Sequence, residues 1–354
     1  MSRKTILIMA GGTGGHIFPG LAVAECLKAQ GWRVIWLGAP SSMESELVPK
    51  QGYAMALVDF YGLRGKGLLR KLSLPFSLLF ALWQSLFVFV QYRPAVVLGM
   101  GGYITVPGGL MAAMLRRPLV IHEQNAVAGM SNRLLARLSK RVMSGFPEVL
   151  PCAEWCGNPV RDNIVSLNDP QQRYGERSGA LNVLVVGGSL GARVINERMP
   201  QALALISQDV RPHVLHQSGK RHYEATQSAY RKAGVEAAVV PFVDNMGFYY
   251  EQADLVVCRA GALTVSELAA AGVASILIPF PHAVDDHQTV NARFLSDRGA
   301  AVLLPQREMS PERLAELLRN MTRERALEMA HAARAAAQPN AAQRVAEVCI
   351  EVAV

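Results

Sequence analysis

The sequence predicts an α/β protein made of two Rossmann-like, doubly wound domains, and three observations support this. Apolar strand-like runs alternate with helix-like segments along the whole chain, which is typical of parallel sheets covered on both faces. A glycine loop follows a strand-like run twice, at residues 11–16 and again at 187–192. The length of 354 residues suits two domains better than one.

The elements of the first half follow from this alternation. Strands are expected at 5–10, 33–38, 54–58, 95–98, 118–122 and 141–144, and helices at 19–29, 42–51, 106–115 and 129–137. Residues 34–37 are continuously apolar, which indicates a strand buried on both faces of its sheet.

The second half repeats the pattern after a connector at 156–161 that is rich in turn residues. Its strands are expected near 182–186, 212–216, 237–241, 254–258, 274–278 and 300–304. Ser310 followed by Pro311 predicts a helix start. These features divide the chain into an N-terminal domain, 1–160, and a C-terminal domain, 161–340. The last helix, within 341–354, is expected to pack back on the first domain.

The net charge and the cysteine pattern limit the classes of partner, compartment and metal site that the sequence allows. The net charge of +8 indicates an anionic partner. The basic residues are scattered and form no basic tail, so nucleic acid is not the favoured partner. The five cysteines include no Cys-x-x-Cys pair, which indicates a reducing compartment, and the His spacing predicts no zinc site. Residues 5–10 are predicted to be a first strand and not a signal peptide.

The uncharged segment 72–92 is long enough to span a membrane. It contains Pro75 and lies inside the α/β pattern, which favours a helix with one face in the core and the other on a membrane surface. A core helix alone would explain only part of the apolar side chains within 62–89, which are Leu68, Leu69, Leu72, Leu74, Phe76, Leu79, Phe80 and Trp83. The cations directly ahead of them predict the basic rim of a peripheral anchor, and they are Arg64, Lys66, Arg70 and Lys71.

The first glycine loop predicts an anion site, because a strand, a glycine turn and a helix N-terminus direct N–H groups at one point. It is not a dinucleotide fingerprint, since Ile17 stands where a third glycine is needed. Neither Lys66 nor Lys220 is followed by Ser or Thr, so a Walker loop is absent. His16, at the end of the loop, is either a polar helix-start residue or a catalytic imidazole.

The second loop leaves an alternative open. Residues 187–191 match the Gly-x-Ser-x-Gly nucleophile elbow, and Asp254 and His282 or His287 follow in hydrolase order. The alternative function is therefore an α/β-hydrolase-type serine esterase that uses Ser189. The matching loop at 11–16 has no place in such an enzyme, and Ser189 could instead hydrogen-bond a phosphate.

Polar residues also follow several strands, where ligands bind in open α/β sheets. They lie at 122–125 and at 285–288, with Asn291 close behind. Thr264 and Glu267 have the spacing of a capping box, although an acid at that place could also bind a ribose diol. The chain contains no Asp-x-Asp pair, so no metal-binding motif for the diphosphate of a sugar nucleotide is predicted.

Together, the motifs at 11–20, 122–125, 157–161, 187–192 and 261–267 resemble the bacterial N-acetylglucosaminyltransferases of peptidoglycan synthesis, the MurG family. The resemblance covers nearly the whole chain in order, with Leu190 standing where the family more often has Gln. It implies the glycosyltransferase-B fold, two domains with a cleft between them. It also implies transfer of GlcNAc from UDP-GlcNAc to the C4 hydroxyl of undecaprenyl-diphospho-MurNAc-pentapeptide, with inversion. The enzyme would be peripheral, at the cytoplasmic face of the bacterial inner membrane.

The resemblance also implies roles for single residues. His16 is the favoured general base, with Glu123 as the alternative. Thr13, Gly14 and Gly15 would border the donor sugar and the acceptor. The donor contacts would come from Asn125, Arg161, Ser189, Val243, Ala262, Leu263, Thr264, Val265, Ser266, Glu267, His287 and Gln288. Of these, Ser189 and Arg161 would hold the diphosphate, Val243 the uracil, Glu267 the ribose, and Asn125, His287 and Gln288 the GlcNAc. No cofactor or metal is expected. An anionic membrane surface is an expected partner, and proteins of cell-wall synthesis or division are left open as others.

Overall fold

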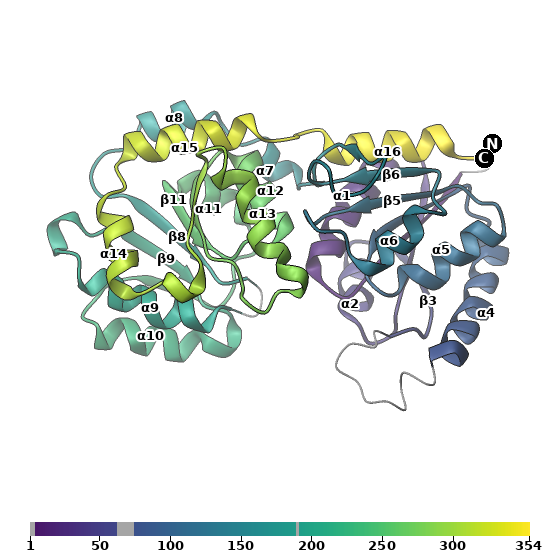
Figure 1. Ribbon diagram of the computed structural model, residues 1–354, viewed down its shortest axis with the longest axis horizontal. Coiled ribbons are helices and arrows are strands. Elements are labelled where there is room, and N and C mark those ends of the chain that lie inside the picture. Colours follow the sequence, from purple (N-terminus) through teal and green to yellow (C-terminus); the bar gives the residue numbers. More distant parts are fainter. Residues whose placement is uncertain (1–3, 62–73, 189–190) are drawn as a thin grey trace. The chain divides into compact units, whose positions relative to one another are not determined.

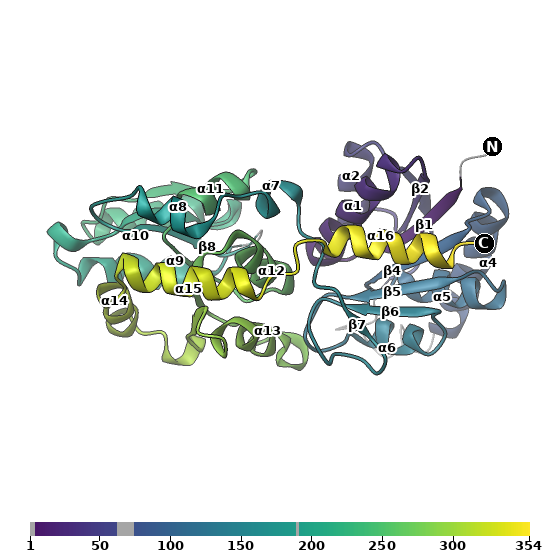
Figure 2. The same ribbon diagram turned by 90° about the horizontal axis from the view of Figure 1, so that it is seen from above.

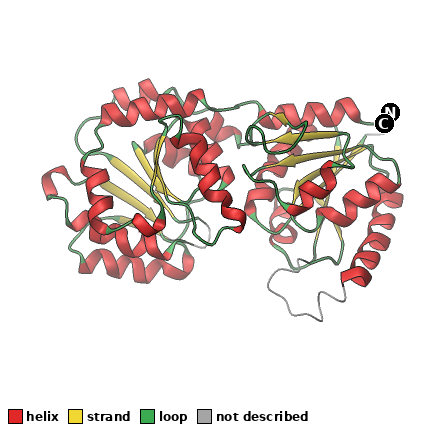
Figure 3. Cartoon of the chain, viewed as in Figure 1, coloured by secondary structure: helices red, strands yellow, loops and turns green. Residues whose placement is uncertain are grey.

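The computed structural model describes residues 4–61, 74–188 and 191–354, and Figure 1 draws the rest as a grey trace. The chain divides into two compact units. The first consists of Met1–Arg161 together with Gln338–Val354, and the second is Asp162–Ala337. Each unit is a parallel sheet covered by helices, as the colours of Figure 3 show.

The sheet of the first unit has seven strands in the order β3-β2-β1-β4-β5-β6-β7, and every pair is parallel. The strands are β1 Thr5–Ala10, β2 Arg33–Gly38, β3 Ala54–Leu57, β4 Val96–Gly101, β5 Leu119–Glu123, β6 Arg141–Ser144 and β7 Glu154–Trp155. Its helices are α1 Gly14–Ala29, α2 Met43–Lys50, α4 Leu74–Tyr92, α5 Thr105–Met114, α6 Met130–Ala136 and α16 Ala341–Val352.

Alternation along β1 explains why this sheet has two cores. Ile6 and Ile8 belong to the core under α1 and α16, whereas Leu7 and Met9 belong to the core under α4 and α5. All four side chains are fully buried. A central parallel strand is covered on both faces and needs apolar residues on both, and β1 has them from Ile6 to Ala10.

Helix α16 comes from the end of the chain and completes the first core. It packs along α1 and against β4 and β5, and Val345, Val348 and Cys349 are buried in the same core as Ile6 and Ile8. Figure 2 looks down on α16, in yellow, where it lies over the first sheet. Arg344 Nε lies 2.6 Å from Glu154 Oε1 and so ties α16 to β7.

The second unit contains six parallel strands in the order β10-β9-β8-β11-β12-β13. They are β8 Asn182–Val186, β9 His213–Gln217, β10 Ala238–Val240, β11 Leu255–Cys258, β12 Ala274–Leu277 and β13 Ala301–Leu303. The main helices are α9 Arg193–Ala204, α10 Tyr223–Lys232, α11 Met246–Gln252, α12 Ala262–Ala271, α13 His287–Ser296, α14 Pro311–Arg319 and α15 Arg323–Ala335, and the short α7 Asp162–Val165 and α8 Pro170–Gly175 open the unit.

In both units the strand order reverses at the first strand, between β1 and β4 and between β8 and β11. Ligands of open α/β sheets bind at such switch points, outside the carboxyl ends of the strands. The two glycine loops follow β1 and β8 and therefore lie at these points.

Three local expectations were wrong. Helix α1 begins at Gly14 and not at 19, so Pro19 lies inside the helix. The N-cap of α12 is Gly261, which places Thr264 in the first turn and rules out the capping box with Glu267. The two-residue strand β7 was not expected. The start of α14 is confirmed, because the Ser310 side chain accepts a hydrogen bond from Arg313 N and Pro311 follows.

Helix α4 is, within the described residues, the one helix long and apolar enough to cross a membrane. Only 22% of its most apolar stretch is buried. Ala81, Ser85, Val88 and Phe89 form the buried face, which packs on α5 and the sheet. The opposite face is exposed. The basic cluster expected ahead of this helix, 64–71, lies outside the described residues.

Candidate active site

A buried carboxylate accepts hydrogen bonds from the main chain of the first unit's glycine loop and of the residue after β2. Gly12, with φ +90°, donates its N–H to Glu44 Oε2 at 3.1 Å, and Ala39 donates to Glu44 Oε1 at 3.2 Å. Glu44 is fully buried in the first turn of α2. A Cβ at Gly11 would collide with Glu44 Oε1, so only glycine fits there. Glu44 thus fixes the path of the loop toward α1.

His16 lies in the first turn of α1 and is half-buried. Its Nδ1 lies 2.7 Å from Gln124 Oε1, just beyond the end of β5. Gln124 Nε2 in turn lies 3.0 Å from His122 Nδ1, and His122 Nε2 lies 2.8 Å from the carbonyl oxygen of Gly157. Burial lowers the pKa of His122 to about 4, so this side chain is neutral at physiological pH.

Glu123, the other candidate base, is almost completely buried. Its Oε1 accepts from Asn125 N at 2.9 Å and Asn125 Nδ2 at 3.3 Å. Its Oε2 accepts from Gly129 N at 3.0 Å and Asn132 Nδ2 at 2.9 Å. Four N–H groups therefore surround this carboxylate, and it shapes the segment between β5 and α6.

The first unit thus brings together several of the expected residues at the carboxyl ends of β1 and β5: Thr13, Gly14, Gly15, His16, Glu123 and Asn125. Arg161 belongs to the same unit and lies near them, with its guanidinium carbon 5.7 Å from the centre of the Phe18 ring.

In the second unit, Ser189 and Leu190 lie outside the described residues, and the flanking glycines are described. Gly188 and Gly191 have φ of +84° and +78°. A Cβ at Gly191 would collide with the carbonyl oxygen of Ser218. The loop therefore passes close to the segment after β9, which only glycine permits.

Gln217, at the end of β9, joins two of the expected donor segments. Its Nε2 donates to Gly188 O at 3.0 Å, and its Oε1 accepts from Val243 N at 3.3 Å. The sequence did not point to this residue, because a glutamine at a strand end reveals nothing about its partners. The signal that could have found it is its position directly after the expected strand 212–216.

The other expected donor residues follow β11 and β12. Residues 262–267 form the first turns of α12, where Glu267 is buried and accepts a hydrogen bond from Tyr250 Oη at 3.2 Å. His287 and Gln288 begin α13, and Gln288 Oε1 accepts from Phe280 N at 2.9 Å. Since all strands are parallel, these segments and the 187–191 loop share one edge of the sheet.

The serine esterase alternative is wrong. Asp254 directly precedes β11 and is fully buried, and it pairs with Arg177 at 2.7 Å and Arg323 at 3.3 Å. It therefore lies at the amino edge of the sheet, whereas the 187–191 loop lies at the carboxyl edge. Four strand residues separate these edges, roughly 13 Å. Asp254 therefore cannot be the acid of a catalytic triad at the carboxyl edge.

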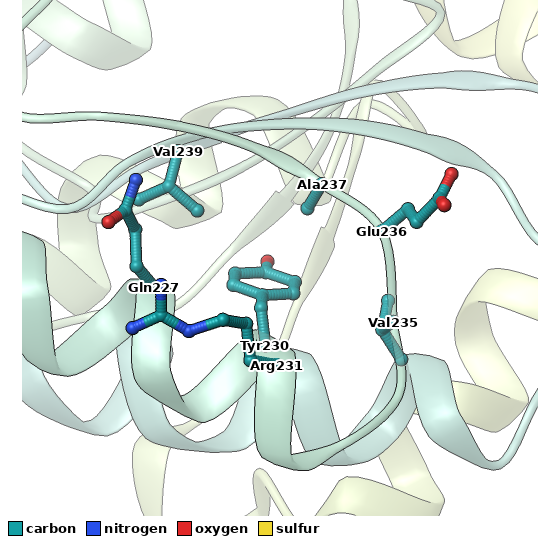
Figure 4. A pocket seen from close by; sticks show the side chains of 7 residues that line it. All are labelled: Gln227, Tyr230, Arg231, Val235, Glu236, Ala237 and Val239. Carbon is teal, nitrogen blue, oxygen red and sulfur yellow. The ribbon is translucent and has the colours of Figure 1, made fainter.

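A pocket of about 280 Å³ lies elsewhere in the second unit. Figure 4 shows it between α10 and the segment leading into β10, with Gln227, Tyr230 and Arg231 on the helix side. This segment precedes β10, so the pocket is at the amino edge of the sheet and is not part of the candidate site. Within the described ranges, no three His, Cys, Asp or Glu side chains gather as metal ligands would.

Comparison with known proteins places these two units in one family. Residues 6–144 match the model of the glycosyltransferase family 28 N-terminal domain, and residues 182–345 match that of the C-terminal domain. The chain is 57% identical over 350 residues, 99% of both chains, to a protein of Dechloromonas aromatica. That protein is named UDP-N-acetylglucosamine--N-acetylmuramyl-(pentapeptide) pyrophosphoryl-undecaprenol N-acetylglucosamine transferase. A protein of the same name from Aromatoleum aromaticum is 59% identical over 99% of this chain and 98% of its own.

Solved structures agree with this. The crystal structure of Acinetobacter baumannii MurG superposes with a TM-score of 0.87 at 44% identity, covering 98% of this chain and 99% of that one. The glycosyltransferase of kitacinnamycin superposes with a TM-score of 0.72 at 17% identity over all of both chains, a likeness of fold alone.

Proposed function

Because this chain belongs to glycosyltransferase family 28, we propose that it transfers GlcNAc from UDP-GlcNAc to the C4 hydroxyl of undecaprenyl-diphospho-MurNAc-pentapeptide. The product is the disaccharide lipid from which peptidoglycan is made. The observation that carries this proposal is the 57–59% sequence identity, over 99% of this chain, with the two transferases described above.

The reaction needs a base for the acceptor hydroxyl and stabilisation of the departing diphosphate. His16 is the base in our proposal, because the Glu123 carboxylate already accepts four hydrogen bonds inside the first unit. The acceptor oxygen attacks C1 of GlcNAc from the face opposite UDP, so the anomeric configuration inverts. The diphosphate is held by Ser189, Arg161 and the glycine loop before α9, and Glu267 binds the ribose.

The function test is UDP release from UDP-GlcNAc, measured with and without the lipid-diphosphate-MurNAc-pentapeptide acceptor. We expect release only when the acceptor is present, together with a disaccharide-lipid product. Labelling of Ser189 by a serine-reactive phosphonate, or equal UDP release in both samples, would contradict the proposal.

The enzyme is membrane-associated in this proposal, at the cytoplasmic face, and α4 supplies the contact. Its exposed face is a stripe spaced three and four residues apart, and the stripe consists of Phe76, Leu79, Phe80, Trp83, Phe87 and Val90. These side chains are 49–76% exposed, although residues of this kind are normally buried. Trp83 contacts Phe80 and Phe87, so three aromatic rings of the stripe touch one another. Such a face lies in the lipid headgroup region of a peripheral protein.

Liposome pelleting tests this surface. We expect the protein to pellet with anionic vesicles at low salt and to be largely released at high salt. Changing Phe76, Trp83 and Phe87 to Ser should reduce pelleting, as should changing Arg64, Lys66, Arg70 and Lys71 to Ser. Leu205→Ser, which alters an exposed apolar residue of the second unit, is the control. Pelleting that resists both high salt and carbonate would instead support a spanning helix.

A further inference from the structure

Gln124 lies between the candidate base and a buried histidine. Its side chain is 1% exposed, and its amide contacts His16, 108 positions away in the sequence, as well as His122. The amide nitrogen lies 3.0 Å from His122 Nδ1 and 2.9 Å from His122 O, and the amide oxygen lies 2.7 Å from His16 Nδ1. Every polar atom of this amide is therefore used.

The direction of each hydrogen bond follows from His122. This imidazole is neutral and carries one N–H. Its Nε2 faces the carbonyl oxygen of Gly157, which can only accept, so the hydrogen is on Nε2 and the Nδ1 lone pair accepts. The group of Gln124 that faces Nδ1 must then be the NH₂. With the amide flipped, its oxygen would face the Nδ1 lone pair and the main-chain oxygen of His122, neither of which can donate a hydrogen bond. The network thus assigns the amide oxygen to His16.

An amide oxygen only accepts hydrogen bonds, so neutral His16 carries its hydrogen on Nδ1 and a lone pair on Nε2. We propose that Gln124 is a positioning residue, which holds His16 in the tautomer whose Nε2 takes the proton of the acceptor hydroxyl. This inference rests on the proposed function, in which His16 is the general base.

The step balances in protons and electrons. His16 Nε2 takes the hydroxyl proton while the acceptor oxygen forms its bond to C1 of GlcNAc. The bond from C1 to the phosphate oxygen breaks, and UDP leaves with the electron pair. His16 is then an imidazolium whose Nδ1–H still points at the amide oxygen. The amide is not basic, so the proton goes no further inward and passes to solvent after turnover.

Two further contacts hold this arrangement. Gly101, at the end of β4, lies against the His16 ring, because a Cβ there would be 2.8 Å from Cε1 and 2.9 Å from Nδ1. Asn158 Nδ2 donates to the main-chain oxygen of Gln124 at 2.9 Å, and Gly157 anchors His122. The Gly157-Asn158 pair, which lies in the expected connector, therefore holds the Gln124 main chain and the His122 ring in place.

The first experiment compares two matched variants, since the chain has a buried glutamine at the strand ends of each unit. We expect Gln124→Leu to lower kcat by about 10- to 100-fold, part of what a general base supplies, and to leave the KM for UDP-GlcNAc within about two-fold. We expect the reverse for Gln217→Leu, a raised donor KM with kcat largely kept, because Gln217 joins the donor segments. An equal loss of kcat in both variants would overturn the proposal.

The second experiment is a double-mutant cycle with His16→Ala. If Gln124 acts through His16, adding Gln124→Leu to His16→Ala should lower kcat by less than about two-fold more. A loss as large as in the wild-type background would overturn the proposal. A wild-type enzyme without acceptor-dependent UDP release would instead refute the proposed function.

The third experiment needs no activity measurement, and its readout comes from the wild-type protein. In ¹⁵N-histidine-labelled wild-type protein, NMR of the ring nitrogens reports which one carries the hydrogen, and His16→Ala identifies the signal. We expect neutral His16 to be protonated at Nδ1. Protonation at Nε2, or an equal mixture of tautomers, would overturn the proposal.

Discussion

Replacing Glu267 by Gln should weaken donor binding while the fold is retained. The carboxylate is buried on α12, and Tyr250 Oη donates to its Oε2 at 3.2 Å. Gln has the same shape and still offers an oxygen to Tyr250. What changes is the charge that a ribose diol would meet.

The magnitude follows from two hydrogen bonds. A hydrogen bond to a charged group contributes about 1.5–3 kcal/mol and a neutral one about 0.5–1.5 kcal/mol, so each ribose contact loses about 1 kcal/mol. Two contacts lose about 2 kcal/mol, which corresponds to a roughly 30-fold rise in the donor KM. Steady-state kinetics with varied UDP-GlcNAc and saturating acceptor measures this rise, and kcat should change little.

Tyr250→Phe is the control, because it removes the hydrogen bond and leaves the carboxylate. It should lower the thermal unfolding temperature and change the donor KM by less than about three-fold, in keeping with a buried bond to a charged acceptor. If Glu267→Gln lowers only the unfolding temperature and leaves the donor KM unchanged, Glu267 has a purely structural role and our reasoning is refuted.

Three more predictions concern the base, the diphosphate and the edge of the first sheet. Gly101→Ala should lower kcat at least about ten-fold without raising the donor KM, since its Cβ would push His16 and φ is +107°; unchanged kcat would contradict this. Activity in excess EDTA should stay close to that in magnesium, because Arg161 and a helix N-terminus hold the diphosphate in our proposal; loss on chelation, restored by metal, would refute it. Hydrogen bonds from Arg344 and Arg141 hold the pKa of Glu154 below its ordinary 4.5, so their stabilisation is present above that pH and is lost as the pH falls through the lowered value. The unfolding temperature of Glu154→Gln should therefore fall less steeply than that of the wild type between about pH 5 and 3. An equally steep fall in both proteins would contradict this prediction.

The sequence predicted the strands well, because parallel strands are continuous apolar runs, as in β1, β2 and β8. It misplaced the start of α1, because Pro19 is typical of a first helical position and the glycines before it are typical of loops. Here Gly14 and Gly15 already belong to the helix. The two residues of β7 offered no periodicity to detect.

The site could be predicted only in part. Loops such as 11–16 carry a local pattern, and the resemblance supplied roles for their residues. The roles of Glu44, Gln124 and Gln217 depend on partners that are distant in the sequence, as with Gln124 and His16, 108 positions apart. A buried polar side chain acquires its role from the groups it faces, and a single sequence does not contain that information.

The position of α16 has a consequence for the order in which the chain is completed on the ribosome. The second unit is one continuous stretch, Asp162–Ala337, whereas the first needs Gln338–Val354 to complete its core. Domains tend to fold as their sequence emerges during synthesis. The unit that is begun first is therefore completed after the second one, and until residues 338–354 emerge, the apolar face of α1 that receives Val345 and Cys349 stays uncovered. A nascent chain stalled just before residue 338 would contain every residue of the second unit and still lack α16 of the first.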